Sequence, residues 1–184
     1  MLKPYKNAKL TDITSPFSAN ETWRDWVHTG VDFSFPNCYG TPLVAPENCV
    51  VENIITPNNF IESSLDEAYR SKLKNGYGIV LKGQRYRHLF WHCQGIFPVS
   101  VGDKVKAGKI VAYIGNSGLV FRGGAFIPLE IRNEKPYLGA HLHQEIYEWL
   151  PNGTIKRYNP VDFIEWNLPI KNDMMDILLS AKVA

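Results

Sequence analysis

Residues 77–93 read YGIVLKGQRYRHLFWHC, and this stretch decides the fold because it holds two short runs that suit β-strands. Both runs are rich in β-branched and aromatic residues, and a glycine lies between them. Similar runs recur along the chain: PLVAP (42–46), CVVENIIT (49–56), KIVAYIG (109–115), HLHQEIYEWL (141–150) and TIKRY (154–158). Many short strands separated by Gly, Pro and Asn predict an all-β protein rather than a βαβ fold.

We therefore predict mostly antiparallel β-sheets in a barrel-sandwich core, with one or two short peripheral helices. Ser63 to Lys74 (SSLDEAYRSKLK) has a serine-rich start and acidic residues in its first turn, which favours a helix. Asn172 to Val183 can form a short amphipathic helix. The expected organisation is a leader over residues 1–22, one domain over 23–168 and a tail, partly helical, over 169–184.

Composition excludes several classes of protein. Of 184 residues, 45% are hydrophobic and 21% are charged, which is ordinary for a globular chain and excludes disordered and fibrous proteins. No apolar run approaches the roughly 20 residues needed to span a bilayer, so no membrane partner is expected. The net charge is +2 without a basic block, so nucleic acid is not expected either. Three cysteines without a C-x-x-C pair argue against a disulfide framework and a cysteine-rich zinc knuckle.

Two spaced pairs of residues carry the chemistry. His28 and Asp32 lie four apart around Gly30, which favours an extended segment with both side chains on one side. His141 and His143 lie two apart, so on a strand they share a face. Imidazole and carboxylate groups are the ligands of catalytic zinc sites, and for each pair the alternative is an ordinary hydrogen-bonded histidine.

A third histidine belongs to the run 87–93. Period-two alternation predicts that His88, Phe90 and His92 share one face of this strand. Cys93 is then expected to point away from His92, which argues against a Cys–His nucleophile pair.

Four segments together resemble the lysostaphin-type (LytM-like) family of zinc endopeptidases. They are HTGVDFSFPNCYGTPLVAP (28–46), FWHCQGIFPVSVGDKVKAGKIVAYIGNSG (90–118), HLHQE (141–145) and YNPVDFI (158–164), and they occur in the family's order. The resemblance covers most of the chain, from about Trp26 to about Ile164. It implies a LytM-like core and hydrolysis of peptide cross-bridges of bacterial peptidoglycan.

The resemblance also implies roles for five residues. His28, Asp32 and His143 match the family's zinc ligands, which implies one Zn²⁺ per chain. His141 matches the catalytic base, and His92 matches the histidine that supports the transition state. His88 has no counterpart and is interpreted as structural.

Two segments depart from the family in length. Asn58 to Tyr77 is longer than the family's minimal core, and Leu119 to Ala140 replaces a short Gly-rich link. Loops of more than about 12–15 residues without regular structure are uncommon in compact domains unless they are functional or disordered. We expect the two segments to form opposite walls of a substrate groove; for Leu119 to Ala140 the alternative is a flap that only packs.

Three other functions compete with this interpretation. A non-catalytic wall-binding or regulatory relative would be expected to lack site residues, and none is missing. A biotin or lipoyl carrier resembles VGDKVKAGKIVAYIG (101–115), but the Met-Lys-Met-like hairpin is absent. A cysteine peptidase needs a thiol at a helix N-terminus, whereas Cys38 and Cys49 follow turn residues.

The N-terminus has no apolar stretch typical of a secretory signal peptide. We therefore expect a phage lysin or virion-associated hydrolase that is made in the cytoplasm and acts on the wall after release. A secreted enzyme without its leader is the alternative. The oligomeric state is open, with a monomer favoured.

Overall fold

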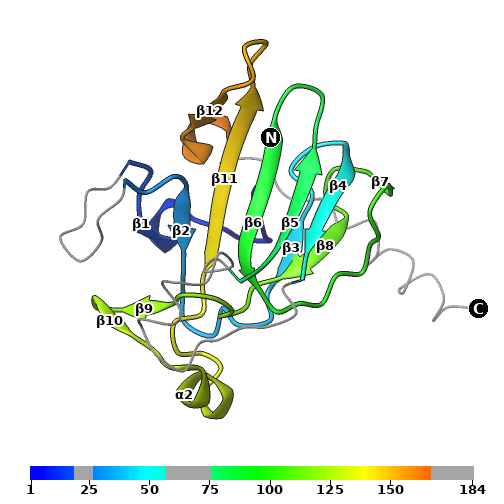
Figure 1. Cartoon of the computed structure of the whole chain (residues 1–184). Coiled ribbons are helices and arrows are strands. Elements are labelled where there is room, and N and C mark those ends of the chain that lie inside the picture. The colour runs from blue at the N-terminus through cyan, green and yellow to red at the C-terminus, as the bar shows by residue number, and fades with distance from the viewer. Residues whose placement is uncertain (19–26, 57–75, 167–184) are drawn as a thin grey trace, which may run out of the picture.

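The computed structural model describes residues 1–18, 27–56 and 76–166, which form a β-rich domain (Figure 1). In chain order the described elements are the 3-10 helix η1 (Leu10–Asp12), the strands β1 (Ile13–Ser15), β2 (Val31–Phe33), β3 (Pro42–Val44), β4 (Cys49–Ile55), β5 (Tyr77–Lys82), β6 (Arg87–Cys93), β7 (Lys104–Val105), β8 (Ile110–Tyr113), β9 (Phe121–Arg122) and β10 (Ala125–Phe126), the helix α2 (Leu129–Glu134), the strands β11 (Leu142–Trp149) and β12 (Ile155–Tyr158), and the 3-10 helix η2 (Pro160–Phe163).

The main sheet has eight strands and is antiparallel throughout. Its order is β1-β2-β11-β6-β5-β4-β7, and β12 pairs with the far part of β11. A second, two-stranded sheet joins β3 to β8, and β9 pairs with β10. Because α2 is the one α-helix among the described residues, the predicted mostly antiparallel β fold is confirmed.

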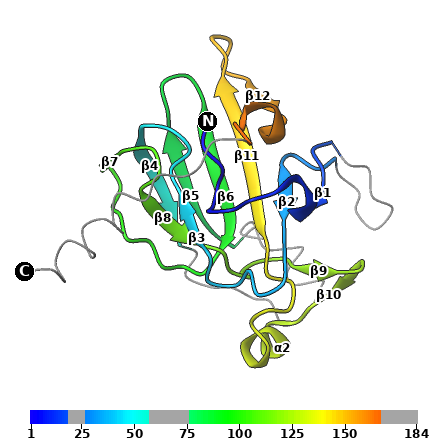
Figure 2. The ribbon, with the colours of Figure 1, turned by 180° about the vertical axis from the view of Figure 1, so that it is seen from behind.

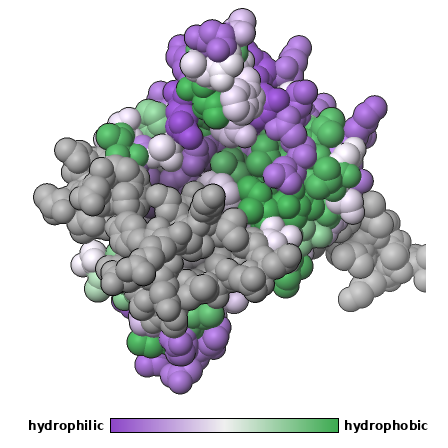
Figure 3. Space-filling view, viewed as in Figure 1, coloured by the Kyte–Doolittle hydropathy of each residue, from purple (hydrophilic) through white to green (hydrophobic). Residues whose placement is uncertain are grey.

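The core lies between the main sheet and the β3–β8 pair (Figure 2). Ile79, Leu81 and Phe90 of the main sheet and Leu43 and Val111 of the small sheet are each fully buried in one cluster. The opposite face of the main sheet carries the functional residues, and Figure 3 shows apolar surface gathered over β4, β5 and β6 on that side. One face of the sheet therefore stabilises the fold and the other is available for chemistry.

The seven runs predicted as strands all contain a strand. The runs that begin at residues 42, 49, 77, 85, 109, 141 and 154 correspond to β3, β4, β5, β6, β8, β11 and β12. The residue pattern does not predict β1, β7, β9 or β10, and at β2 it predicts only an extended segment; each of these strands has two or three residues. Runs this short show no periodicity, so tertiary pairing rather than local pattern makes them strands.

The segment 119–140 is more regular than expected. Gly123 and Gly124 both have positive φ and form the turn between β9 and β10, where Phe121 faces Phe126 across the pair with ring centroids 6.1 Å apart. Pro128 then precedes α2, which ends before Pro136. Glycine tolerates the left-handed backbone of such turns, and proline favours helix boundaries, so local chemistry explains the difference.

Residues 1–18 pack against the rest of the domain. Tyr5 is 1% exposed and belongs to the core cluster, and β1 pairs with β2. The expected boundaries at residues 22 and 168 stay predictions, and the helices expected over 63–74 and 172–183 lie outside the described residues. Within the described ranges, the helices are too short and too polar to cross a membrane.

Candidate metal centre

Three potential ligands meet at the junction of β2 and β11. Asp32 of β2 lies directly opposite His143 of β11 in the antiparallel register, so both side chains leave the same face. His28 precedes β2. Nε2 of His28 lies 3.1 Å from Oδ1 of Asp32 and 2.9 Å from Nδ1 of His143, and that Nδ1 lies 2.8 Å from the same Oδ1. The structure thus brings together the three residues predicted as ligands.

His28 does not reach this position as part of a regular strand. The backbone bends at Gly30, and β2 begins only at Val31. A Cβ atom at residue 30 would lie 2.3 Å from the carbonyl oxygen of Gln144 and 2.8 Å from Nε2 of His143. Only glycine permits this close approach, so Gly30 is part of the site. This role of Gly30 was not predicted, although a glycine between two candidate ligands is a signal for close backbone packing.

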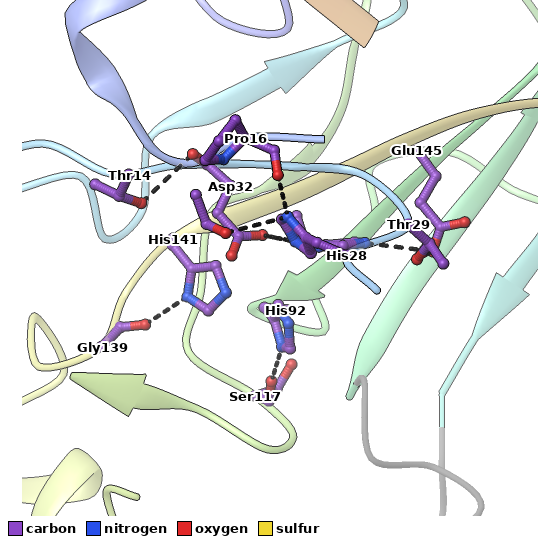
Figure 4. Close-up of polar contacts among 12 residues, drawn as sticks. Thr14, Pro16, His28, Thr29, Asp32, His92, Ser117, Gly139, His141 and Glu145 are labelled. Carbon is purple, nitrogen blue, oxygen red and sulfur yellow. Dashed lines mark hydrogen bonds and ion pairs between the residues drawn. The ribbon is translucent and has the colours of Figure 1, made fainter. Parts of the chain in front are cut away.

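The second nitrogen of each imidazole has its own partner (Figure 4). Nδ1 of His28 lies 2.9 Å from the carbonyl oxygen of Pro16 and 3.2 Å from Oγ of Ser15. Because a carbonyl oxygen only accepts, this Nδ1 carries the proton and Nε2 presents its lone pair to Asp32 and His143. The partner comes from the segment expected to be a leader, so that segment helps to orient a ligand.

Glu145 fixes the other imidazole. Its Oε1 lies 3.3 Å from Nε2 of His143 and accepts a hydrogen bond from Oγ1 of Thr29 at 3.1 Å, while Nε of Arg157 donates to Oε2 at 3.1 Å. The carboxylate holds the proton on Nε2 and leaves Nδ1 of His143 directed at Asp32 and His28. Such a carboxylate behind a histidine is common in metal sites, and the H-x-H-x-E spacing is the sequence signal that could have identified it.

The electrostatics of the three groups are strongly coupled. Burial opposes ionisation of Asp32, but the hydrogen bond from His143 and the close contact with His28 outweigh it and hold the pKa of the carboxyl well below its usual range. Burial disfavours protonation of His143, but Asp32 and Glu145 together raise the pKa of its imidazole to about 9. In the metal-free protein His143 is therefore protonated on Nδ1, and this proton lies against Asp32 where a metal ion would bind.

The donor set fits a zinc ion. Two imidazole nitrogens and one carboxylate oxygen are ligands that zinc prefers, and catalytic zinc sites use three protein ligands and leave one position open. Metal–ligand bonds of about 2.0 Å in a tetrahedral site place the ligand atoms about 3.3 Å apart. The observed separations of 2.8 to 3.1 Å are close to this value. Among the described residues, one group of histidine, cysteine or acidic side chains has ligand atoms close enough to hold a metal ion, and it consists of His28, Asp32 and His143.

His92 reaches the site through an irregularity in β6. Ile79 pairs with Phe90 and Tyr77 pairs with Cys93, so Gly78 alone faces two residues, Trp91 and His92. His92 has a φ of 58°, in the left-handed region. Such a bulge redirects side chains. The expected common face of Phe90 and His92 is therefore wrong: Phe90 and Cys93 are buried in the core, whereas His92 lines the cavity with the ligands.

The two remaining candidate residues lie side by side with fixed ring orientations. The ring centroids of His92 and His141 are 4.3 Å apart. Nδ1 of His92 donates to the carbonyl oxygen of Ser117 at 2.7 Å, and Nδ1 of His141 donates to that of Gly139 at 2.8 Å (Figure 4). In the neutral form each ring therefore carries its proton on Nδ1 and presents an unprotonated Nε2.

Burial keeps both of these rings neutral. Desolvation, reinforced by His141 and His143, lowers the pKa of His92 well below the usual histidine range. Desolvation is also the largest cause of the lowered pKa of His141, although Asp32 opposes it. A neutral imidazole with a free Nε2 is a proton acceptor at neutral pH, which is the property a general base needs.

The five residues share one cavity of about 1100 Å³. One side is formed by the segment predicted as a wall, with lining residues Leu119, Phe121, Arg122, Gly123, Gly124, Tyr137, Gly139 and Ala140. On another side the lining residues come from β1 and the segments 27–29 and 35–37. The second predicted wall, Asn58 to Tyr77, lies outside the described residues except for its last two positions.

The other polar candidates lie away from this cavity. His88 is fully buried on the core side, and its Nε2 lies 2.7 Å from Oε1 of Glu47. Cys38, Cys49 and Cys93 are free and buried. Burial raises the pKa of the Cys49 thiol to about 12 and that of Cys93 further. Neither thiol forms a thiolate at neutral pH, which argues against the cysteine peptidase alternative.

Comparisons with known proteins identify the family and the fold of the chain. A sequence model of peptidase family M23 matches residues 26–160. The structure of LytU is similar over 88% of this chain and 89% of that one, with 26% identity and a TM-score of 0.57. The catalytic domain of the prophage-encoded M23 protein EnpA from Enterococcus faecalis is similar over 86% and 95%, with 22% identity and a TM-score of 0.54. The catalytic domain of the antimicrobial peptidase lysostaphin from Staphylococcus simulans is similar over 81% and 88%, with 23% identity and a TM-score of 0.52. No curated protein sequence matches the chain significantly.

Proposed function

Because the chain belongs to peptidase family M23, as a lysostaphin-type (LytM-like) member, we propose that it is a zinc-dependent endopeptidase that hydrolyses peptide cross-bridges of bacterial peptidoglycan. The observation that carries this proposal is the shared cavity, in which three ligand atoms at mutual distances of 2.8 to 3.1 Å face two neutral histidines. This pairing of a metal-binding triad with proton acceptors is what hydrolysis of a peptide bond requires.

His28, Asp32 and His143 would hold the ion. When bound, zinc supplies a Lewis acid and lowers the pKa of water toward about 7. Pro16 and Glu145 keep the two imidazoles in the tautomers that direct Nε2 of His28 and Nδ1 of His143 at this position. The carboxylate of Asp32 is already ionised at neutral pH, so it contributes its charge without a proton step.

His141 acts as the base. Its Nδ1 is committed to the carbonyl oxygen of Gly139, so its free Nε2 receives the proton of the attacking water. His92 is assigned to the developing negative charge on the carbonyl oxygen of the substrate. Because Nδ1 of His92 already donates to Ser117, Nε2 donates to an oxyanion only when the ring carries a second proton. This assignment requires that His92 be protonated during the reaction, against its lowered pKa.

The segment Leu119 to Ala140 is proposed as the wall that selects the cross-bridge. It contributes two exposed groups to the lining of the cavity, Tyr137 at 58% exposure and the guanidinium of Arg122. Tyr137→Ala should change KM or the preferred bond while zinc content and kcat stay constant. Identical kcat/KM values on every substrate would show that the segment only packs.

Digestion of purified peptidoglycan of two chemotypes, followed by mass spectrometry of the released peptides, tests the function. We expect new termini at one type of peptide bond, lost on chelation and restored by zinc. Release of sugar fragments alone, or no release by the zinc-loaded protein, would contradict the proposal. Action as a phage lysin, in a virion or as a secreted enzyme stays a prediction.

A further inference from the structure

Three consecutive carbonyl groups in the turn after β8 have three different partners. The carbonyl oxygen of Gly115 accepts from the backbone N–H of His141 at 3.2 Å, and that of Ser117 accepts from Nδ1 of His92 at 2.7 Å. The carbonyl oxygen between them, that of Asn116, accepts from Nη1 of Arg132 on α2. One short turn thus contacts both histidines assigned to catalysis, and an arginine holds its centre.

Arg132 is unusual in its burial. Its side chain is 1% exposed and is the largest fully buried side chain among the described residues. Its Nε also donates to the carbonyl oxygen of Ile127 at 2.9 Å. Arginine is almost never fully buried unless its donors are satisfied, because desolvation of the charge is costly. The guanidinium therefore joins α2 firmly to the turn, and Nδ2 of Asn116 adds a bond to the carbonyl oxygen of Pro136 at 3.0 Å.

The inner side of the turn is fixed to the end of β6. Oγ of Ser117 donates to the carbonyl oxygen of Cys93 at 2.7 Å and accepts from the backbone N–H of Tyr77 at 3.0 Å. A Cβ atom at Gly115 would lie 2.5 Å from the carbonyl carbon of Cys93. Because the inner side has no free space, release of the outer side would tilt the peptide groups that hold His92 and His141.

We propose that Arg132 is a positioning residue for both catalytic histidines, acting through the peptide groups of residues 115–117. Its partners among the described residues, Ile127 and Asn116, are neither ligands nor lining residues of the cavity, so its loss should leave the zinc site intact and misplace the two rings. The wall that borders the substrate and the groups that transfer protons are then joined by one side chain. The expected fall in kcat rests on the proposed function, whereas the expected displacement of the two imidazole rings does not.

Three substitutions in the zinc-loaded full chain test the proposal. Arg132→Lys keeps a cation without the two-armed contact, Arg132→Ala removes the side chain, and Lys104→Met removes an exposed cation of β7, outside the lining of the cavity, as a control. Misplacement of catalytic groups by about 1 Å costs on the order of 100-fold in rate. We expect kcat to fall about 10- to 100-fold in both Arg132 variants with KM and zinc content unchanged, and no change in Lys104→Met.

Two further measurements separate positioning from simple loss of structure. Guanidinium at non-denaturing concentration should restore part of the kcat of Arg132→Ala by occupying the vacated space. Long-range ¹H–¹⁵N spectra should show the imidazole signals of His92 and His141 shifted in the variant and returned by guanidinium. These spectra report on the effect of Arg132 even if the wild-type chain cleaves no wall peptide. Failure of the proposed function is therefore distinguishable from failure of the positioning role of Arg132.

Several results would overturn the proposal. They are a folded Arg132→Ala or Arg132→Lys with wild-type kcat, a fall in kcat accompanied by loss of zinc, and unchanged imidazole signals of both histidines. If Arg132→Ala does not fold, Arg132→Lys alone decides, because it must lower kcat without loss of zinc.

Discussion

The ligand triad and the catalytic pair lie in one cavity but are held by different means. Asp32 and His143 are placed by the cross-strand register of β2 and β11, and side chains or carbonyls from separate segments orient the two imidazole ligands. His92 and His141 are placed by a bulge and by backbone carbonyls of Ser117 and Gly139. The sheet therefore defines where the metal binds, whereas irregular backbone defines where protons move. Mutations should separate the two functions.

The largest effect is expected for the metal ligands. His143→Ala removes one of three ligand atoms and the 2.8 Å contact of Nδ1 with Asp32, so stoichiometric zinc and all measurable hydrolysis should be lost. His88→Gln is the matched control, since His88 is buried in the neighbouring strand and faces Glu47 instead. It should lose stability but keep zinc. Elemental analysis of both purified variants checks this, and full zinc in His143→Ala would disprove the ligand assignment.

The catalytic pair should show the opposite behaviour. His141→Ala and His92→Ala keep the triad, so zinc and fold should be retained while the rate falls about 10²–10⁴-fold for the base and about 10²–10³-fold for the oxyanion donor. Glutamine distinguishes the two roles, because it donates a hydrogen bond but does not accept a proton at neutral pH. His92→Gln should recover part of the rate and His141→Gln none. Recovery by His141→Gln instead would reverse the roles.

Gly30→Ala should produce an intermediate effect that reaches the triad through the backbone. The added methyl group meets the carbonyl oxygen of Gln144 at 2.3 Å, so β2 must move away from β11. Overpacking of this kind costs about 1–3 kcal/mol, and zinc affinity should fall with it. Thermal unfolding and zinc titration of the variant measure both quantities. An unchanged melting temperature together with unchanged affinity would show that the contact is not restrictive.

The smallest effect is expected in the pH dependence of zinc affinity, because a proton and zinc compete for Nδ1 of His143. The raised pKa of His143, about 9 against an ordinary 6.5, means that its ring is protonated at neutral pH without metal. This proton stabilises the metal-free fold fully below pH 6.5, and the contribution is lost as the pH rises through about 9. Zinc must displace the proton, so its affinity should rise with pH until about 9. Calorimetry at pH 7.5 in two buffers should show release of about one proton per zinc, and no release would contradict the ion pair.

Local spacing predicted the longer strands and two candidate pairs of site residues, whereas the choice of His143 as ligand and of His141 as base came from the resemblance to the family. The pairs His28–Asp32 and His141–His143 identify candidate ligands whatever the tertiary register is. The opposition of Asp32 to His143 depends on pairing of segments 111 residues apart, which no local pattern encodes. The bulge at His92 also depends on tertiary pairing, so the alternation of side chains along residues 87–93 predicted the wrong face for His92.

The supporting residues were harder to predict than the ligands. Glu145 belongs to the motif HLHQE, but the motif alone predicts no role for it, and the carbonyl group of Pro16 has no side-chain signature at all. Arg132 lies in a segment interpreted as an irregular wall, where a buried cation is not expected from the pattern of residues. Groups that act through backbone atoms are visible only in the folded chain.

Anomalous diffraction from zinc-soaked crystals, recorded at the zinc absorption edge, tests the division between ligands and catalysts most directly. We expect one strong peak per chain within bonding distance of Nε2 of His28, Oδ1 of Asp32 and Nδ1 of His143, with Nε2 of His143 still on Glu145. A peak held by His141 or His92, or by Nε2 of His143, would contradict the account.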